Sequence, residues 1–143
     1  GKKMNRIILL TPNEGMSHQH LAELQLSGLK GDIFTKETHS LFTGTFIDII
    51  DIHKLQEDSG DKTIAVDAFE GNNLVLVDEG HRGSSGDDFG HWMKMRQKIC
   101  ENGFSFEYSA TFGQAIKASA NPKYEEIYSK CIILSLIFSF SCG

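Results

Sequence analysis

A short apolar run that ends in two adjacent carboxylates is the feature of this sequence that most constrains its fold. Leu74 to Val77 are consecutive apolar residues in the segment NLVLVDEGHRG, and Asp78, Glu79 and then His81 follow them. A run of this kind, rich in β-branched residues, is typical of a buried strand of a parallel sheet covered on both faces. Open α/β sheets bind ligands at the carboxyl ends of such strands. The run therefore predicts an α/β fold with a site at these acids.

Two neighbouring acids at the end of a strand suit a site for magnesium and a nucleotide. One carboxylate can hold the water shell of the ion, while the other orients or deprotonates the attacking water. The alternative is an acidic surface turn, because apolar runs that end in charged residues are common at strand ends. Asp78 and Glu79 alone do not decide between these two interpretations.

A second candidate strand lies further along the chain, in the segment FSFEYSATF. Phe104, Phe106 and Tyr108 alternate with polar residues, and this period of two is typical of a strand with unlike faces. Ser109 and Thr111 then supply two hydroxyls beside a small residue. A carboxylate or histidine nearby can approach such a turn and be hydrogen-bonded. The segment therefore predicts a second strand end that carries polar groups.

A third segment near the amino end, RIILLTPNEGMSHQHLAEL, predicts a strand, a turn and a helix in succession. Ile7–Leu10 has the composition of a strand, and Thr11 and Asn13 belong to the turn. Ser17 is the expected first hydroxyl of the following helix.

Together, these three segments resemble three motifs of the superfamily 2 helicases and translocases, the DEAD/DEAH-like group. The DEGH tetrapeptide resembles motif II, the Ser-Ala-Thr turn resembles motif III, and TPNEG followed by a serine and QH resembles motif Ia. The longer TPNEG form is similar to that of the motor subunit of type III restriction enzymes. The resemblance spans residues 6–118 in the family's order. It implies a three-layer, RecA-like domain of the P-loop NTPase fold with a mainly parallel sheet.

The resemblance also implies a role for each motif residue in ATP-driven movement on DNA. Asp78 would hold magnesium through its water shell, and Glu79 would position or activate the water that hydrolyses ATP. His81 would sense the γ-phosphate and pass its state to the hydroxyls of Ser109 and Thr111.

The amino-terminal motif is the expected contact with DNA. By resemblance, Thr11, Asn13 and Ser17 would lie near nucleic-acid phosphates; for Ser17 the alternative is simple helix capping, which uses the same geometry. The net charge of −5 argues against a generally basic nucleic-acid binder. It does not exclude a local contact, because main-chain amides at the amino end of a helix need no basic surface.

The sequence contains no G-x-x-x-x-G-K-[ST] phosphate loop. That loop supplies backbone amides and a lysine to the β- and γ-phosphates, so nucleotide binding without it should be weak. Gly1, Lys2 and Lys3 do not replace it, because they precede a strand and not a helix. Since the loop lies upstream of motif Ia in the family, we expect residues 1–143 to be a partial first motor domain, incomplete at its amino end and inactive alone. Its partners would be DNA, bound weakly, the remaining motor and nuclease domains, and a methyltransferase or specificity subunit.

Composition and cysteine spacing restrict the class of protein further. A length of 143 residues with 40% apolar content predicts one folded domain. Cys100, Cys131 and Cys142 are widely spaced, which indicates a reducing cytoplasm and neither a disulfide framework nor structural zinc. The amino-terminal apolar run is too short for a signal peptide. The tail CIILSLIFSFSC is too short to span a bilayer, which needs about twenty apolar residues, so no membrane association is expected.

The rest of the sequence predicts alternating strands and helices. Further strands or turns are expected at 32–35, 45–52 and 63–68. Helices are expected at 16–27, 92–102 and 122–130. Met95 and Ile99 would form the apolar face of the second helix, which Gly103 ends. The stretch 56–62 is an expected loop, and the glycine-rich segment 83–90 predicts a mobile loop near the acids.

Two other functions stay open on the sequence alone. A metal-dependent hydrolase or nuclease could use the cluster of acids and histidines formed by Asp78, Glu79, His81, Asp87, Asp88 and His91. No pair in it has the helical HExxH spacing, and a glycine-rich loop rarely preorganises ligands, which counts against this function. The other possibility is a noncatalytic interaction module derived from a decayed motor. The missing phosphate loop favours it, and the intact acids count against it.

Overall fold

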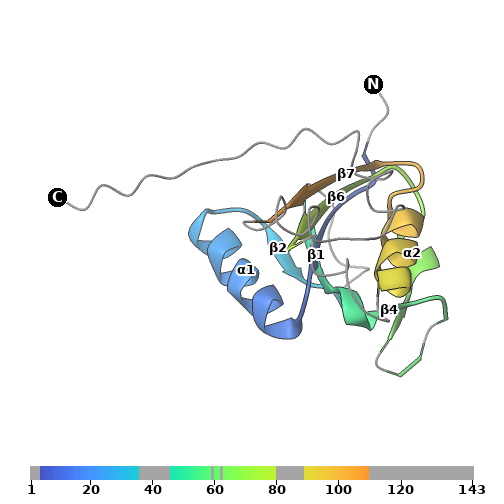
Figure 1. Ribbon diagram of the computed structural model, residues 1–143. Helices are drawn as coiled ribbons and strands as arrows, with labels where there is room; N and C mark the ends of the chain where they lie inside the picture. Colours follow the sequence, from blue (N-terminus) through green and yellow to red (C-terminus); the bar gives the residue numbers. More distant parts are fainter. Residues whose placement is uncertain (1–3, 36–45, 59, 62, 80–88, 110–143) are drawn as a thin grey trace.

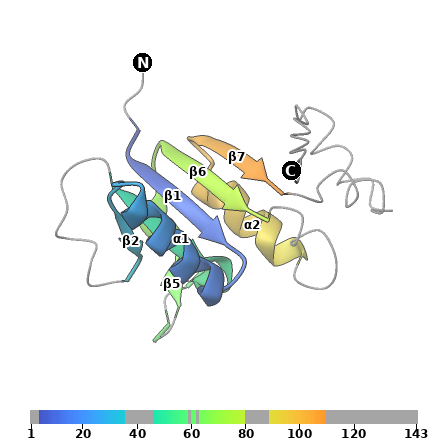
Figure 2. The same ribbon diagram turned by 90° about the vertical axis from the view of Figure 1, so that its left-hand side faces the viewer.

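The computed structural model describes residues 4–35, 46–58, 60–61, 63–79 and 89–109. Its main sheet has five parallel strands in the order β2-β3-β1-β6-β7, flanked by helices (Figures 1 and 2). The strands are β1 (Arg6–Thr11), β2 (Gly31–Ile33), β3 (Ile47–Asp51), β6 (Asn73–Asp78) and β7 (Phe104–Tyr108). The helices are α1 (Glu14–Leu26) and α2 (Phe89–Ile99). The predicted α/β fold with a parallel sheet is confirmed, and its general character is Rossmann- or RecA-like.

Short elements connect β3 to β6 beside this sheet. They are η2 (Ile52–Lys54), β4 (Leu55–Gln56), β5 (Ile64–Ala65) and η3 (Val66–Phe69), and β4 and β5 pair in parallel as a separate ladder. The strands expected at 32–35 and 45–52 correspond to β2 and β3. The strand or turn expected at 63–68 corresponds to β5 and η3, whereas the loop expected at 56–62 begins with the last residue of β4.

The sheet has two faces that the two helices cover separately. Figure 2 shows α1 in front of the β2 and β1 side of the sheet, with α2 behind β6 and β7. Residues in register across the strands share a face, because side chains alternate along each strand. The α1 face carries Leu9 and the residues in register with it: Ile49, Leu76 and, one strand further, Phe106. The α2 face carries the intervening residues.

The main hydrophobic core lies on the α2 face. Leu10 and Val75 from the strands pack in one buried cluster with Trp92, Met95 and Ile99 of α2. Complete burial of a side chain of this size stabilises the fold by about 1.5–3 kcal/mol. The expected apolar face of this helix, Met95 and Ile99, is therefore confirmed.

The described elements cover the α1 face over only half of its width. Leu74 and Leu76 of β6 are half-buried, and Phe104 and Phe106 of β7 are 60% and 51% exposed. The expected coverage of the β6 run is therefore confirmed on the α2 face, whereas the described residues bury its α1 face only in part. We call this uncovered area, Leu74, Leu76, Phe104, Phe106 and Tyr108, the open half-face.

Both helices begin earlier than expected. Asn13 is the N-cap of α1, because its side-chain oxygen accepts a hydrogen bond from the Met16 amide at 2.9 Å. The expectation that Ser17 supplies the first hydroxyl of this helix is therefore wrong. Helix α2 starts at Phe89, so the predicted loop 83–90 is wrong at its last two residues. The rest of that loop lies outside the described residues. The helix expected at 122–130 and the apolar tail also lie outside them.

Asn73 explains why α2 ends at Ile99 and not near residue 102. Its buried side-chain amide donates to the carbonyl oxygens of Phe69 and Ile99, so the end of the helix is held against the start of β6. A tight turn follows, in which the Gly103 amide donates to the Cys100 carbonyl at 3.0 Å. The chain then enters β7 beside β6.

We expect Gly103→Ala to destabilise the fold by about 1–3 kcal/mol or more, because a β-carbon there would collide with backbone atoms of Asn73, including its nitrogen at 2.7 Å. Gly90→Ala in α2 is the matched control, since a β-carbon at Gly90 has no neighbour within 4 Å among the described residues. That control should be neutral or stabilising by about 0.5–1 kcal/mol. Urea unfolding measures both, and equal free energies of unfolding for the two variants would contradict the close approach.

Candidate functional site

Three neighbouring strands end at one edge of the sheet and bring the predicted site residues together. Thr11 ends β1, Asp78 ends β6, and Tyr108 ends β7 in register with Asp78. Glu79 and Ser109 follow directly. Because all strands are parallel, this carboxyl edge is where a sheet of this type places ligands. The expected location of the acids is therefore confirmed.

The turn between β1 and α1 is built from the three residues that the sequence assigned to DNA. The Thr11 and Ser17 hydroxyl oxygens lie 2.6 Å apart, and both side chains are buried, at 0% and 1% exposure. The Thr11 hydroxyl oxygen also lies 3.2 Å from the Asn13 carbonyl oxygen and 3.3 Å from the Ile50 carbonyl oxygen, either of which can accept its single proton. Thr11 and Ser17 thus fasten the turn from inside, whereas Asn13 is exposed at the amino end of α1. The proximity of these three residues to DNA stays a prediction.

Asp78 pairs with a histidine that the sequence analysis did not select. Its Oδ2 lies 2.7 Å from Nε2 of His20 in α1, and both side chains are largely buried. The other ring nitrogen, Nδ1, lies 3.3 Å from Oε2 of Glu23, one turn further along the helix. His20 therefore bridges two carboxylates. Because one oxygen of Asp78 takes part in this pair, the ring restricts the rotation of the carboxylate.

A signal for His20 was present in the spacing of α1. Ser17, His20 and Leu24 are at helical positions i, i+3 and i+7, which share one face. Ser17 contacts Thr11, and the Leu24 side chain lies beside Gly31 of β2, so this face is the one turned to the sheet. The helical spacing does not predict that Asp78 is the partner of His20, because that contact depends on the tertiary structure.

Glu79 leaves the strand in an unusual backbone conformation and contacts the second motif. Its φ is 52°, in the left-handed region that non-glycine residues seldom adopt. Such strained residues cluster at functional sites, where the surrounding structure holds them in place. The Ser109 hydroxyl donates to Glu79 Oε2 at 3.4 Å. This contact joins the acids to the serine turn, as the two segments together predicted.

The acids affect Tyr108, the neighbour of Asp78 across the ladder. Burial, followed by the negative charges of Asp78, Glu23 and Glu79, raises the pKa of Tyr108 from its ordinary value of 10.0 to about 12. All of these causes favour the neutral phenol in the folded protein.

We expect ultraviolet difference titration of wild type against Tyr108→Phe to show tyrosinate formation near pH 12 and not near pH 10. Because the pKa of Tyr108 is raised on folding, the neutral phenol contributes to the free energy of unfolding below the pKa of the unfolded chain, about 10. This contribution is lost as the pH rises through about 12, the pKa in the folded protein. Asp78→Asn should move the transition toward lower pH. Circular dichroism recorded in parallel separates unfolding from ionisation. A Tyr108 transition near pH 10 in the folded protein would contradict the partly buried, acidic environment of the phenol.

The donor set at this edge fits magnesium held together with a nucleotide better than a metal held by protein alone. Magnesium keeps several waters and usually binds through one or two carboxylates plus substrate phosphates, a requirement that Asp78 and Glu79 satisfy. Among the described residues, no group of three or more His, Cys, Asp or Glu side chains could hold a metal ion. His91 of the alternative metal cluster lies in α2 and contacts the Leu55 carbonyl at 3.0 Å. His81, Asp87, Asp88 and Thr111 lie outside the described residues.

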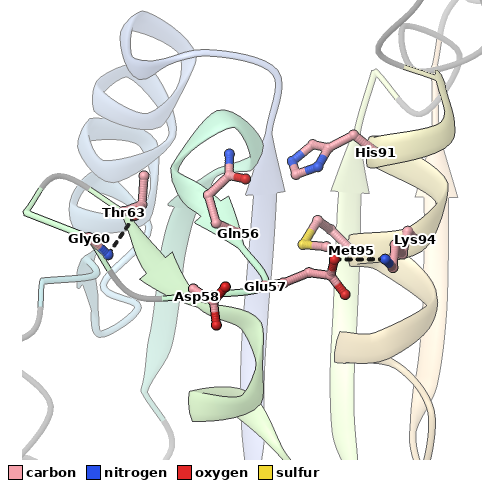
Figure 3. Close-up of a pocket in the computed structure, with 8 residues that line it drawn as sticks. All are labelled: Gln56, Glu57, Asp58, Gly60, Thr63, His91, Lys94 and Met95. Atoms are coloured by element: carbon pink, nitrogen blue, oxygen red, sulfur yellow. Dashed lines mark hydrogen bonds and ion pairs between the residues drawn. The ribbon is translucent and has the colours of Figure 1, made fainter.

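A polar hollow lies apart from these acids (Figure 3). It has a volume of about 490 Å³, and its lining includes Gln56, Thr63 and Lys94. It also includes His91 of the alternative metal cluster, but none of the described residues predicted for the motor site. Lys94 lies 2.8 Å from Glu57, and together with Lys98 it lowers the pKa of that carboxyl. Because Lys94 and Glu57 of this hollow are paired with each other and the motif residues lie elsewhere, we assign the candidate site to the carboxyl edge.

Comparison with known protein families finds no family that matches the chain, and comparison with curated proteins finds no match either. Among the described residues, no helix has the length and apolar character needed to cross a bilayer. The functional argument therefore depends on the geometry of the carboxyl edge and on the sequence motifs.

Proposed function

We propose that this chain is part of the first, RecA-like motor domain of a cytoplasmic superfamily 2 DNA helicase or translocase, most similar to the motor subunit of type III restriction enzymes. The observation that carries the proposal is the contact between Glu79 and Ser109 beside Asp78, at the carboxyl edge of a parallel sheet. The residues that resemble motifs II and III lie apart in sequence, and the fold brings them within hydrogen-bond distance. The phosphate loop and the ATP-dependent activity would belong to a longer protein.

The topology supports this proposal. Crossover connections between parallel strands are almost always right-handed, so connections that run in opposite directions across a sheet place their helices on opposite faces. The connection from β1 to β2 places α1 on one face, and that from β6 to β7 runs the other way and places α2 on the other. If a further strand lay beside β7 and preceded β1 in the sequence, its connection to β1 would cross the sheet in the same direction as the connection from β1 to β2. Its helix would therefore lie on the α1 face, over the open half-face.

Such a strand and helix are what a phosphate loop requires. The helix would cover Phe104, Phe106 and Tyr108, which no described element covers. Its amino end would lie at the carboxyl edge, beside Asp78 and Glu79, where the helix dipole and free amides favour phosphate. The open half-face thus has the position and the apolar character that the missing element of the family would need.

At this edge the residues of the chain have separable tasks. Asp78, with one oxygen held by His20, would orient the water shell of magnesium. Glu79, held by the Ser109 hydroxyl, would orient or deprotonate the attacking water. Bound magnesium and ATP would supply the phosphoryl chemistry. His81 and Thr111 keep their proposed coupling roles as predictions.

DNA would meet the site at the amino end of α1. Asn13 is exposed there, and the first amides of the helix are donors that suit a phosphate. The buried hydroxyls of Thr11 and Ser17 would hold the shape of this turn and reach DNA only if the turn opens. Since the net charge is −5, we expect DNA binding by this chain alone to be weak.

The test is magnesium-dependent ATP hydrolysis, with and without DNA, by the 143-residue chain and by the full reading frame that contains it. We expect turnover only in the longer protein, with stimulation by DNA. If the longer protein also lacks turnover, or contains no phosphate loop, the proposal is wrong. A noncatalytic interaction module that uses the open half-face would then be the better explanation.

A further inference from the structure

One histidine connects the helix that would meet DNA to the acid that would hold magnesium. His20 lies in α1, its side chain is 15% exposed, and its Nε2 is 2.7 Å from Asp78 Oδ2. The contact joins residues 58 positions apart in the sequence. It is much shorter than the 3.9 Å between His18 and Glu14 on the solvent side of the same helix.

The ring has little freedom in this position. Glu23 Oε2 lies 3.3 Å from its Nδ1, so a carboxylate oxygen faces each ring nitrogen. A proton on Nε2 lets the ring donate to Asp78 and restrict the carboxylate to one orientation. Partners of this kind, which orient a carboxylate that binds a metal, typically change metal affinity or activity by about 10–100-fold when they are removed.

We propose that His20 is a positioning residue that links α1 to Asp78, so that occupancy of the amino end of α1 by DNA changes the magnesium dependence of ATP hydrolysis. This inference rests on the proposed function and extends it to regulation of the same site. The link is direct, because α1 is fastened to two strand ends: Ser17 contacts Thr11 of β1, and His20 contacts Asp78 of β6. A phosphate bound near Asn13 that displaces α1 displaces His20 relative to the acid.

The test compares three variants of the longer, ATP-hydrolysing protein. In wild type, we expect DNA to lower the magnesium concentration for half-maximal hydrolysis. His20→Ala should raise that concentration by about 10-fold or more and should abolish the effect of DNA on it. His20→Gln should restore much of both effects, since its amide nitrogen can reach nearly the position of Nε2. His18→Ala, which removes the exposed histidine of the same helix, should behave as wild type.

The outcomes separate this inference from the proposed function. If wild type hydrolyses ATP but His20→Ala and His18→Ala show the same magnesium and DNA dependence, the link through His20 is wrong and the motor function stands. If wild type shows no turnover, both fail. A loss of activity in His20→Ala without a change in magnesium dependence, or one that Gln does not restore, would indicate a purely structural histidine and would also overturn the inference.

A measurement on the 143-residue chain tests the contact without any activity. Nitrogen-15 NMR of the histidine rings should show a hydrogen-bonded His20 Nε2 whose shift changes in Asp78→Asn and is unchanged in Asp51→Asn, a carboxylate whose side chain accepts from the His53 amide. Equal His20 spectra in all three proteins would show that the pair does not form and would overturn the inference.

Discussion

Glu79→Gln in the longer protein should lower ATP turnover by about 10²- to 10⁴-fold, the usual contribution of a general base. Glutamine has nearly the same shape, and its amide oxygen can still accept the hydrogen bond from Ser109, so the fold and the turn are retained. What is lost is the charge that, in the proposed function, would orient and deprotonate water. The measurement is steady-state hydrolysis at saturating magnesium and ATP, together with nucleotide binding, which should stay within a few-fold of wild type.

Glu101→Gln is the matched control for this substitution. Glu101 is an exposed acid in the turn after α2, so the same chemical change there should leave turnover unaltered. If Glu79→Gln retained turnover within about threefold of wild type, Glu79 would not be the general base. The acids would then have a structural or interaction role, and the left-handed conformation at Glu79 would need another explanation.

Arg96→Met should destabilise the domain by about 3–5 kcal/mol, the largest effect on stability that the structure predicts. Arg96 is 6% exposed in α2, and its Nη1 lies 2.6 Å from Oε1 of Glu107 in β7. Removal of one partner leaves the other charge buried without compensation, which costs much more than loss of a surface pair. Urea unfolding of the 143-residue chain measures the free energy.

Two further variants isolate the cause of this loss. Lys98→Met removes a cation from the same helix, but its pair with Glu57 at 3.2 Å is exposed and screened by solvent, so the cost should be much smaller than that of Arg96→Met. Replacement of both partners, Arg96→Met with Glu107→Leu, should recover most of the loss, because no uncompensated charge remains. Equal costs for Arg96→Met and Lys98→Met would show that the Arg96 pair is not buried in solution.

The pair between Arg96 and Glu107 also shows where the sequence pattern was insufficient. The alternation in β7 correctly predicts a strand with two unlike faces. It does not say which face the helix covers, and the usual expectation would bury the phenylalanines. In the structure α2 covers the face of Glu107, while Phe104 and Phe106 remain on the open half-face. Which face is buried depends on the direction of the crossover, which is a property of the whole sheet.

Helix boundaries give a second example. The sequence predicted both described helices but not their ends. Asn13, and not Ser17, caps α1. The end of α2 is fixed by Asn73 of β6, which is distant in the sequence. Short-range patterns identify helices because their hydrogen bonds are local. They identify the ends less well, because any nearby polar group can satisfy the free amides and carbonyls there.

The sequence by itself determined that the chain forms parallel strands, that two of them end in acids and hydroxyls, and that these groups share one edge. Local hydrophobic periodicity and the common direction of parallel strands are sufficient for that inference. Only the tertiary structure decided that Ser109 contacts Glu79, that His20 contacts Asp78, and that the described helices leave half of one sheet face uncovered. These facts depend on strand order and on the faces chosen by the crossovers, which bring together residues that no local pattern relates.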